Sequence, residues 1–419
     1  MTKYCGFERL CDTEPGKGFM IETIHRPSVE DLVERASSLS DFLAERSAST
    51  EKAGRVSREQ TEAIQGAGLH RVSQPLAFGG YGYGPSAVFK TTFELARSCP
   101  STSWCTMVAN SNAWFASYWP LEVQQEVWGV NSDAMIAISG IPVGKGRPVD
   151  GGYEIWGAWP WASNSDNCQW AIVSSAIADT ENDRPETQWF LVPMDELIID
   201  QESWDMAGMQ GTGSKTLVRS DPMFVPERRR VKLAQVSSDT TPGRSIPGNS
   251  VAAYNFATLS GVVLLGPVLG MAQAALDLFL ETMRNKVKTT LRAGATETVA
   301  ANPAVQLRVA DASARIDAAI ALLLSSVEPF EAKVAAGLPV SVEERVRIRR
   351  NVGFAGRQAF EAMNILIEGA GASSFAARAP LQRLWRDLTV AVRHVTLDTD
   401  GVYIMYGQER FGLQPLGAF

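Results

Sequence analysis

The chain has 419 residues, of which 45% are hydrophobic and 20% are charged, and its formal net charge is −7. This composition is typical of a soluble globular protein with a large core, and the acidic balance argues against a nucleic-acid partner. The five cysteines and three histidines include no CxxC pair and no cluster with metal-ligand spacing. We therefore expect no metal site, no disulfide framework and a reducing, cytoplasmic location.

The N-terminal part of the chain predicts helices. Residues 1–27 form an extension of mixed charge that lacks the apolar core of a signal peptide. Residues 28–130 predict a helical domain, which opens with Ser28 as an N-cap and with Glu30 and Asp31 in the first turn. The glycine-rich segment 75–85 has no strand before it and no Lys-Ser/Thr after it, so we interpret it as a loop and not as a nucleotide motif.

Residues 131–235 change in character. Alternating and β-branched runs occur at 135–139, 153–156, 170–174 and 189–192, and turns rich in Gly, Asp and Asn separate them. This pattern is typical of short antiparallel strands. The segment therefore predicts a central antiparallel β domain.

Residues 236–419 return to helical patterns. Asn302 and Pro303 have the residue types of an N-cap and a first helical position. An apolar stripe follows at helical spacing, made of Val305, Val309, Ala312, Ile316, Ala319 and Leu323. With further helices expected over 256–276, 341–367 and 380–407, this part predicts a four-helix bundle.

Two helical segments can each be interpreted in more than one way. Residues 256–276 carry no charge and could span a bilayer by length. They also contain glycine, serine and proline, so we expect a buried bundle helix and no membrane. A basic cluster follows later in the chain, for which we expect a solvated or salt-bridged helix face; its members are Arg345, Arg347, Arg349, Arg350 and Arg357.

Five motifs in order carry a family resemblance. They are the segments 99–104 (CPSTSW), 157–163 (GAWPWAS), 208–215 (GMQGTGSK), 225–228 (VPER) and 380–387 (PLQRLWRD), the last followed by His394. On these motifs nearly the whole chain resembles the group D flavin-dependent monooxygenases of the acyl-CoA dehydrogenase fold. That family includes oxygenases of p-hydroxyphenylacetate, dibenzothiophene, indole, indole-acetate and amino sugars. The resemblance implies an α+β, mainly α fold, with an N-terminal helical domain, the β domain and the C-terminal bundle.

The resemblance also implies the chemistry. A separate flavin reductase, which need deliver the flavin only by diffusion, would supply reduced FMN or FAD. With dioxygen as cosubstrate, a C(4a)-hydroperoxyflavin would then hydroxylate or epoxidise an aromatic or indole-like small molecule. The sequence has no GxGxxG on a strand–helix turn, which fits a flavin that another protein reduces. Relatives of this fold are usually homotetramers.

The catalytic residues implied by the resemblance are His394 and Ser163. Dehydrogenases of this fold carry a glutamate a short way after an Arg-Asp pair, whereas here Arg386 and Asp387 are followed by His394, with no carboxylate until Asp398. An imidazole titrates near neutrality, so it can accept a substrate proton or donate one.

The resemblance assigns further residues to the flavin. Trp161 would stack by the flavin ring, Ser163 would bond its N5/O4 edge, and Thr212 and Ser214 would lie along the flavin or its phosphate. The remaining candidates, expected at the phosphates or the cofactor's tail, are Arg284, Gly369 and Gly371. Asn164 replaces the family's usual glycine and leaves the backbone geometry of this loop open.

A substrate pocket is expected from one helix, with candidate residues Trp104, Asn110, Asn112, Trp114 and Phe115. Asn112 falls where relatives often have a second histidine. Because asparagine cannot act as an acid or a base, it would position the substrate there.

Three alternatives remain open. The first is an N-oxygenase of an amine or amino sugar, for which Asn110 or Asn112 would provide polar contacts. The second is an acyl-CoA dehydrogenase, against which the missing glutamate and the absence of acids over 250–276 both argue. The third is a non-enzymatic assembly protein, against which the retained Ser163 and His394 motifs argue.

Overall fold

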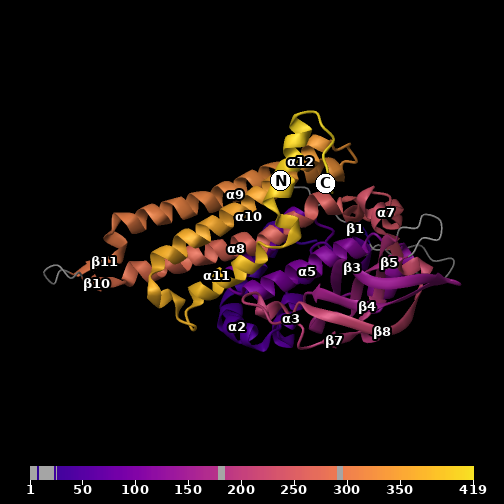
Figure 1. The fold of residues 1–419 in the computed structure, drawn as a ribbon, viewed down its shortest axis with the longest axis horizontal. Helices are drawn as coiled ribbons and strands as arrows, with labels where there is room; N and C mark the ends of the chain where they lie inside the picture. Colours follow the sequence, from indigo (N-terminus) through magenta and orange to yellow (C-terminus); the bar gives the residue numbers. More distant parts are fainter. Residues whose placement is uncertain (1–6, 9–22, 25, 178–184, 290–295) are drawn as a thin grey trace.

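The computed structural model describes residues 7–8, 23–24, 26–177, 185–289 and 296–419. Most of the predicted N-terminal extension, with Cys5, Cys11 and His25, therefore lies outside the described residues. A sheet gathers at one end of the molecule and a bundle of long helices extends to the other, with the N-terminal helices beside both (Figure 1). This mainly helical architecture confirms the predicted fold class.

The first helical group contains a capped entry helix and a fully buried central helix. The Ser28 hydroxyl accepts the Asp31 N–H, and the Asp31 carboxylate accepts the Ser28 N–H, so both orphan donors are satisfied. All residues of α5 are buried, which makes this helix the link between the sheet and the bundle. The helices of this group are α1 (Val29–Ser38), α2 (Ser40–Ala53), α3 (Arg58–Gly66), α4 (Pro85–Ala96), α5 (Pro100–Ala116) and α6 (Leu121–Trp128).

The central sheet is mixed, which corrects the prediction of a purely antiparallel domain. Its strands are β3 (Ile136–Val149), β4 (Gly152–Ala162), β5 (Trp170–Ile177), β6 (Glu186–Pro193), β7 (Ile198–Asp200), β8 (Lys215–Pro226) and β9 (Arg230–Lys232). Their spatial order is β7-β8-β4-β3-β5-β6-β9. Because β5 returns to the far side of β3 after the hairpin to β4, it runs in the direction of β3 and pairs with it in parallel.

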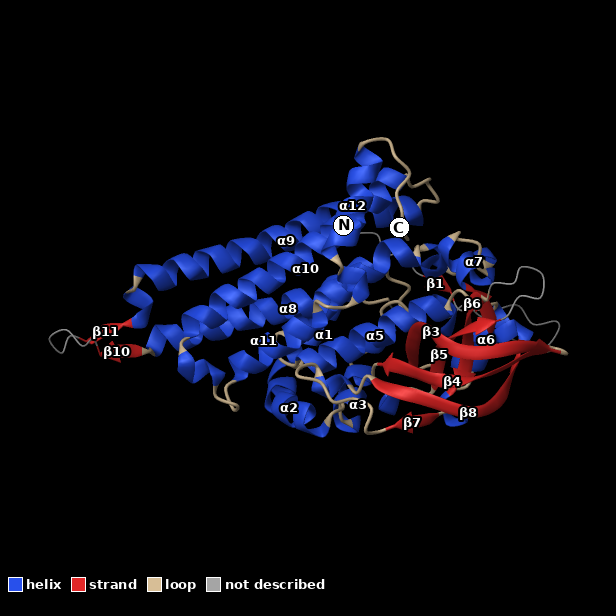
Figure 2. Ribbon diagram, in the orientation of Figure 1, coloured by secondary structure: helices blue, strands red, loops and turns tan. Residues whose placement is uncertain are grey.

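The C-terminal half is a bundle whose long helices lie side by side (Figure 2). The Asn302 side chain accepts the Ala304 N–H and Pro303 begins the helix, as the sequence predicts. Residues of the predicted stripe from Ala312 to Leu323 are buried, and the stripe continues to Phe330. The elements are α7 (Leu233–Ser237), α8 (Phe256–Asn285), β10 (Val287–Thr289), β11 (Thr296–Thr298), α9 (Pro303–Ala335), α10 (Val342–Ala370), α11 (Pro380–Ala391) and α12 (Thr399–Arg410).

The prediction of one helix over 380–407 is wrong. Helix α11 ends at Ala391 and α12 begins at Thr399. Between them the His394 side chain accepts the Thr396 N–H, and the Asp398 carboxylate caps α12 by accepting the Gly401 N–H. These local side-chain bonds compete with helix continuation and place His394 in a non-helical turn.

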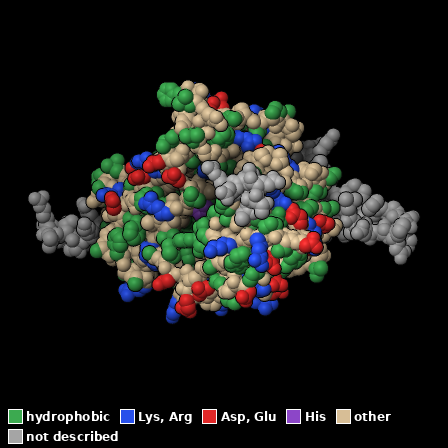
Figure 3. All heavy atoms as spheres, turned by 45° about the vertical axis from the view of Figure 1, so that its right-hand side comes forward, with side chains coloured by type: hydrophobic (Ala, Val, Ile, Leu, Met, Phe, Trp, Pro, Cys, Tyr) green, Lys and Arg blue, Asp and Glu red, His purple; other side chains and the backbone are tan. Residues whose placement is uncertain are grey.

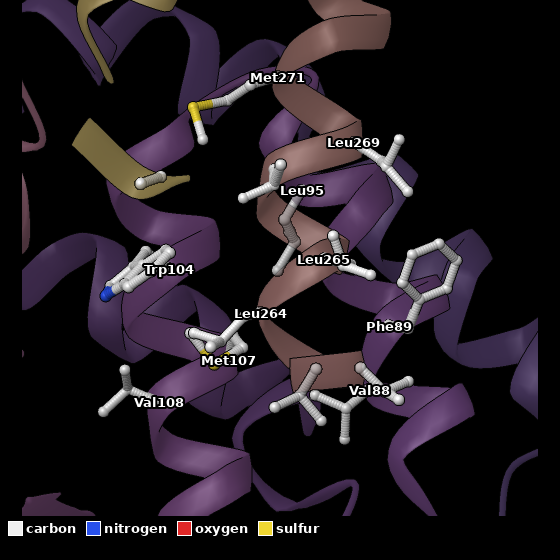
Figure 4. Packing of buried hydrophobic residues seen from close by; sticks show 14 of the residues in the cluster. Val88, Phe89, Leu95, Trp104, Met107, Val108, Leu264, Leu265, Leu269 and Met271 are labelled. Carbon is white, nitrogen blue, oxygen red and sulfur yellow. The ribbon is translucent and has the colours of Figure 1, made fainter. Parts of the chain in front are cut away.

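Helix α8 is the apolar helix at the centre of the bundle. It is long and apolar enough to span a membrane, but 83% of its most apolar window is buried inside the protein. Leu264, Leu265 and Leu269 lie among side chains of α4 and α5 (Figure 4). Gly266 and Gly270 bring α8 against α4, because an added Cβ would clash with Thr92 or with the Phe93 carbonyl. Its packing is that of a core helix.

A buried carboxylate joins the bundle to the N-terminal helices. Glu331 of α9 accepts the Ser86 N–H at 2.7 Å and also contacts the Ser86 hydroxyl. It thereby caps α4, whose own N-cap residue, Gly84, has no side chain to do so. Burial raises the pKa of Glu331 from 4.5 to about 7.

This raised pKa makes a pH-dependent contribution to stability. Since the folded protein holds the proton on Glu331 more tightly than the unfolded chain does, the contribution is fully present below pH 4.5 and is lost as pH rises through about 7. We expect Glu331→Gln to remove this pH dependence, which amounts to roughly 2–4 kcal/mol in the free energy of unfolding. The measurement is the Tm of both proteins at intervals from pH 4.5 to 8. Parallel Tm curves for the two proteins would contradict it.

Candidate active site

Hydrogen bonds connect four side chains where α5, β4 and β8 meet. Trp104 Nε1 donates to Ser163 Oγ at 3.3 Å, Ser163 Oγ lies 2.6 Å from Ser214 Oγ, and Ser214 Oγ lies 2.7 Å from Thr212 Oγ1. Thr212 Oγ1 then donates to the Met209 carbonyl at 2.8 Å. The series begins at an indole that only donates and ends at a carbonyl that only accepts, so each hydroxyl donates in the same direction. In this state Ser163 donates its proton inward, to Ser214.

Left-handed backbone concentrates around this hydroxyl chain. Among the described residues, four non-glycine residues have positive φ, and three of them are Trp161 (67°), Asn164 (63°) and Met209 (57°). Asn164 thus adopts the conformation that the family's usual glycine would favour, with its N–H donating to the Thr212 carbonyl at 2.9 Å. Such conformations cost about 1–3 kcal/mol each and tend to cluster at functional sites.

Trp161 lies at the surface next to the hydroxyl chain. Its side chain is 51% exposed, and its ring meets the Trp204 ring edge-on at 5.3 Å between centroids. An indole held by one neighbouring ring leaves a face free for a flat ligand.

The turn that presents Thr212 is held by α11. Asp387 Oδ1 accepts the buried Met209 N–H at 2.5 Å. The adjacent Arg386 donates to the Ala207 carbonyl at 2.6 Å, and an added Cβ on Gly208 would clash with the Arg386 carbonyl. Burial raises the pKa of Asp387 to about 6. The position of α11 therefore sets the position of the hydroxyl chain.

His394 follows α11 and faces the same indole. Its ring centroid is 6.3 Å from that of Trp104. Nδ1 lies 2.8 Å from Thr396 Oγ1 and accepts the Thr396 N–H at 3.3 Å, so the hydrogen-bond network assigns the proton of the neutral ring to Nε2.

The His394 ring is in contact with solvent, yet protein atoms surround it. Of the two described histidines it is the exposed one, and Figure 3 shows histidine atoms inside a hollow of the surface. Desolvation in this recess lowers the pKa of His394 to about 4. The ring is neutral at pH 7 and offers Nε2–H as a donor.

Some side chains of α5 and α8 keep slight contact with solvent. One face of α5 keeps 6–7% exposure, at Ser101, Trp104, Val108 and Ser111. Other residues of α5 keep only 0–1%, among them Ser103, Met107 and Asn110. On α8 the residues Ala257, Ser260 and Leu264 keep 6–8%. From this residual contact at helical spacing we expect a narrow slot between the two helices, lined mainly by apolar groups.

The structure brings one of the predicted pocket residues, Trp104, against both Ser163 and His394. Phe115 lies further along α5, against Phe256. Asn110 instead bonds the backbone of Ser73 and Leu69, and Asn112 donates to the Ile136 carbonyl at 2.7 Å. Trp114 is 1% exposed and packs in the core. These three side chains hold α5 in place, away from Ser163 and His394.

Arg284, Gly369 and Gly371 lie at the other end of the bundle. Lys286 Nζ donates to the Ala370 carbonyl at 3.0 Å, which fixes the 369–371 turn beside the C-terminal end of α8. This is the end marked by β10 and β11 in Figure 1, away from the sheet. One subunit therefore does not bring these residues together with Ser163.

Asp387, Met209 and Thr396 were missed as site residues. Asp387 and Met209 stand inside two of the quoted motifs, but only the fold shows that they bond to one another. For Thr396 a local signal exists, because a hydroxyl two residues after a histidine can anchor its ring nitrogen.

Comparisons with known proteins identify the family. Residues 262–399 match the model of the acyl-CoA dehydrogenase C-terminal domain. The chain is 33% identical over 384 residues to the oxygenase subunit HsaA of a flavin-dependent monooxygenase from Rhodococcus jostii, covering 91% of this chain and 98% of that one. The chain belongs to the oxygenase components of flavin-dependent monooxygenases.

Further relatives agree with this assignment. The oxygenase component of an FADH2-dependent resorcinol hydroxylase from Rhizobium is 32% identical over 394 residues, with 93% of this chain and 96% of that one covered. The crystal structure of 3-HSA hydroxylase from Rhodococcus superposes with a TM-score of 0.85 at 32% identity, covering 91% and 97% of the two chains. The predictions of an oxidoreductase and of a reduced-flavin cofactor from a separate reductase are confirmed, and the dehydrogenase alternative falls away.

The role of Asp387 can be tested by comparing Asp387→Ala with Asp387→Asn. Alanine leaves the buried Met209 N–H without an acceptor, at a cost of about 1–3 kcal/mol, and frees the strained turn. Asparagine keeps an acceptor oxygen. We expect a lower Tm and weaker flavin binding for Asp387→Ala, with Asp387→Asn close to wild type. Tm and flavin fluorescence quenching measure the two effects, and equal losses in both variants would refute the role.

Proposed function

We propose that this monooxygenase hydroxylates an aromatic small molecule with reduced FAD as its flavin. The observation that carries the proposal is the meeting of the Ser163 hydroxyl chain and neutral His394 at Trp104. The relatives support the substrate class, because they include a resorcinol hydroxylase, a p-hydroxyphenylacetate 3-hydroxylase and an indole-3-acetate monooxygenase. The first of them is named as FADH2-dependent.

The residues around Ser163 fit a flavin ring. The bound flavin would supply the activation of dioxygen. Trp161 would stack on the ring system, while Ser163, Ser214 and Thr212 would face its polar edge. An exposed indole beside a row of hydroxyls and left-handed backbone provides both contacts that a flat, heteroatom-edged ring needs.

Ser163 can act as a donor or as an acceptor in this site. If it turns its proton toward the flavin, Ser214 must donate to Ser163, and Thr212 must donate to Ser214. The Met209 carbonyl then loses the Thr212 hydroxyl but keeps the Thr212 N–H at 3.1 Å and Trp204 Nε1 at 3.1 Å. Reversal therefore leaves no buried carbonyl unsatisfied.

His394 would hold the substrate through its Nε2–H. Thr396 fixes the other ring nitrogen, and desolvation keeps the ring neutral, so the proton remains on Nε2. The apolar slot would exclude water from the reacting oxygen and from the bound substrate.

A homotetramer would explain why three of the residues expected at the flavin lie at the far end of the bundle from Ser163. Arg284, Gly369 and Gly371 would meet the flavin tail of a neighbouring subunit. Exposed apolar side chains at the C-terminus support burial against another copy, among them Val395, Ile404, Phe411, Leu413 and Leu416. We place the protein in the cytoplasm, in line with its free, buried Cys99, Cys105 and Cys168.

The residues expected to contact an amine substrate are engaged elsewhere in the structure. Asn110 and Asn112 were the groups expected to contact an amine, and backbone groups engage both of them. The structure therefore favours an aromatic ring over an amine as the acceptor of oxygen.

The test supplies reduced FAD and dioxygen with resorcinol as the probe. We expect hydroxylated product from the wild type, a shift from product toward hydrogen peroxide in Ser163→Ala, and a rate lower by about a hundredfold in His394→Ala. Ser165→Ala is the matched control, because Ser165 bonds the Gly213 carbonyl outside the hydroxyl chain. The proposal fails if neither resorcinol nor simple phenols and indoles yield product while free and bound flavin oxidise equally fast.

The neutral state of His394 is a separate prediction. With its pKa near 4, the ring should stay uncharged from pH 8 down to about 5 and gain a proton only as pH falls through 4. NMR titration of the imidazole signals, with His394→Gln to assign them, measures this directly. An apparent pKa of 6.5 or higher would contradict the desolvated, neutral ring.

A further inference from the structure

The basic cluster on α10 contains one arginine that does not behave as expected. The predicted salt-bridged face is confirmed for Arg345, whose Nη2 lies 2.9 Å from Asp239, and for Arg347, which pairs with Glu343. Arg349 differs because it points into the protein and is 9% exposed.

Arg349 forms no close ion pair among the described residues. No carboxylate there lies within the 4.0 Å of an ion pair with it. Asp398 acts on it from beyond that distance, while its own carboxylate accepts the Gly401 N–H at 3.2 Å. Burial lowers the pKa of Arg349 from its usual value. A buried guanidinium nevertheless stays charged, so its charge calls for a compensating group.

The unused edge of this guanidinium matches a carboxylate. Nη1 donates to the Thr396 carbonyl at 3.2 Å. Nε is buried without a partner, and Nη2 has no acceptor in the described part of the chain. Nε–H and Nη2–H form one edge of the planar group and point in parallel, which is the fork that binds the two oxygens of a carboxylate.

Arg349 and His394 share one neighbour, Thr396. The Thr396 carbonyl accepts from Arg349, and the Thr396 hydroxyl lies 2.8 Å from His394 Nδ1. On α8, a Cβ added to Gly261 would lie 3.5 Å from Arg349 Nη1. Gly261 is next to Ser260 and one turn from Ala257 and Leu264, the α8 residues of the slot.

We propose that Arg349 is an anion subsite that binds a carboxylate of the substrate. This inference rests on the proposed function, since it takes the slot as the substrate site. It narrows the substrate class to an aromatic acid whose ring lies near Ser163 and His394 and whose carboxylate reaches Arg349.

The test measures binding without flavin or turnover. The probes are 3-(4-hydroxyphenyl)propanoate and its neutral amide, titrated calorimetrically into the wild type, Arg349→Met, Arg349→Lys and Arg350→Met. We expect the wild type to prefer the acid and Arg349→Met to weaken acid binding about tenfold to a hundredfold, with the amide unchanged. Arg349→Lys should keep part of the preference, because it retains the charge without the fork.

Arg350→Met is the matched control. Arg350 is next in sequence, bonds Asn351 and lies 4.4 Å over the Tyr406 ring, so its loss should leave the acid preference intact. A wild type without acid preference would overturn the anion subsite, as would equal weakening of acid and amide by Arg349→Met. Comparing the binding of the acid and the amide to the wild type tests the anion subsite even if Arg349→Met does not fold. Failure of the monooxygenase proposal would appear separately, as absent product with reduced FAD while the acid preference persists.

Discussion

The bond between the Asp387 carboxylate and the Met209 N–H is the constraint on which the site depends. It joins residues 178 positions apart in the chain, one on the bundle and one in the turn before β8. Because Met209 is left-handed, its N–H faces α11 while its carbonyl receives the Thr212 hydroxyl. The same helix ends just before His394. One buried acceptor therefore sets the relative positions of the hydroxyl chain and the imidazole.

The strained residues of the site are held by short-range bonds. Left-handed conformations at Trp161, Asn164 and Met209 together cost several kcal/mol at about 1–3 kcal/mol each. The Ser163 N–H to the Trp161 carbonyl and the Asn164 N–H to the Thr212 carbonyl offset part of that cost. Since the second bond links the end of β4 to the turn before β8, movement of one segment would disturb the other. The cofactor edge is thus built as one rigid unit.

The sequence could predict features that depend on neighbouring residues. Ser28 and Asn302 cap helices as expected because a cap is made within a few residues. The direction of β5 depends on which side of β3 it pairs, and the end of α11 depends on competing bonds from His394 and Asp398; neither follows from periodicity. Family motifs identified Ser163, Thr212 and Ser214 together, whereas their link to Asp387 required the fold.

Arg349 shows the same limit within one helix. Arg345 and Arg349 are four residues apart, so helical spacing puts them on one face and predicts one environment for both. Only the segments that pack against the two arginines distinguish them. Arg345 pairs with Asp239, whereas Arg349 donates to the Thr396 carbonyl. A salt-bridged surface and a buried cation therefore have the same sequence pattern.

Burial acts in one direction on the titratable groups around the slot. It raises the pKa of Asp387, lowers that of His394 and lowers that of Arg349, and each shift favours the uncharged form. Asp387 can take up a proton, and His394 can stay without one. Both groups can therefore be uncharged in the folded protein. Arginine cannot follow, because a guanidinium stays protonated in proteins. Arg349 is therefore the one of these three groups that stays charged. Asp398 acts on it only from beyond ion-pair distance, and a substrate carboxylate bound there would meet the charge where solvent screening is weak.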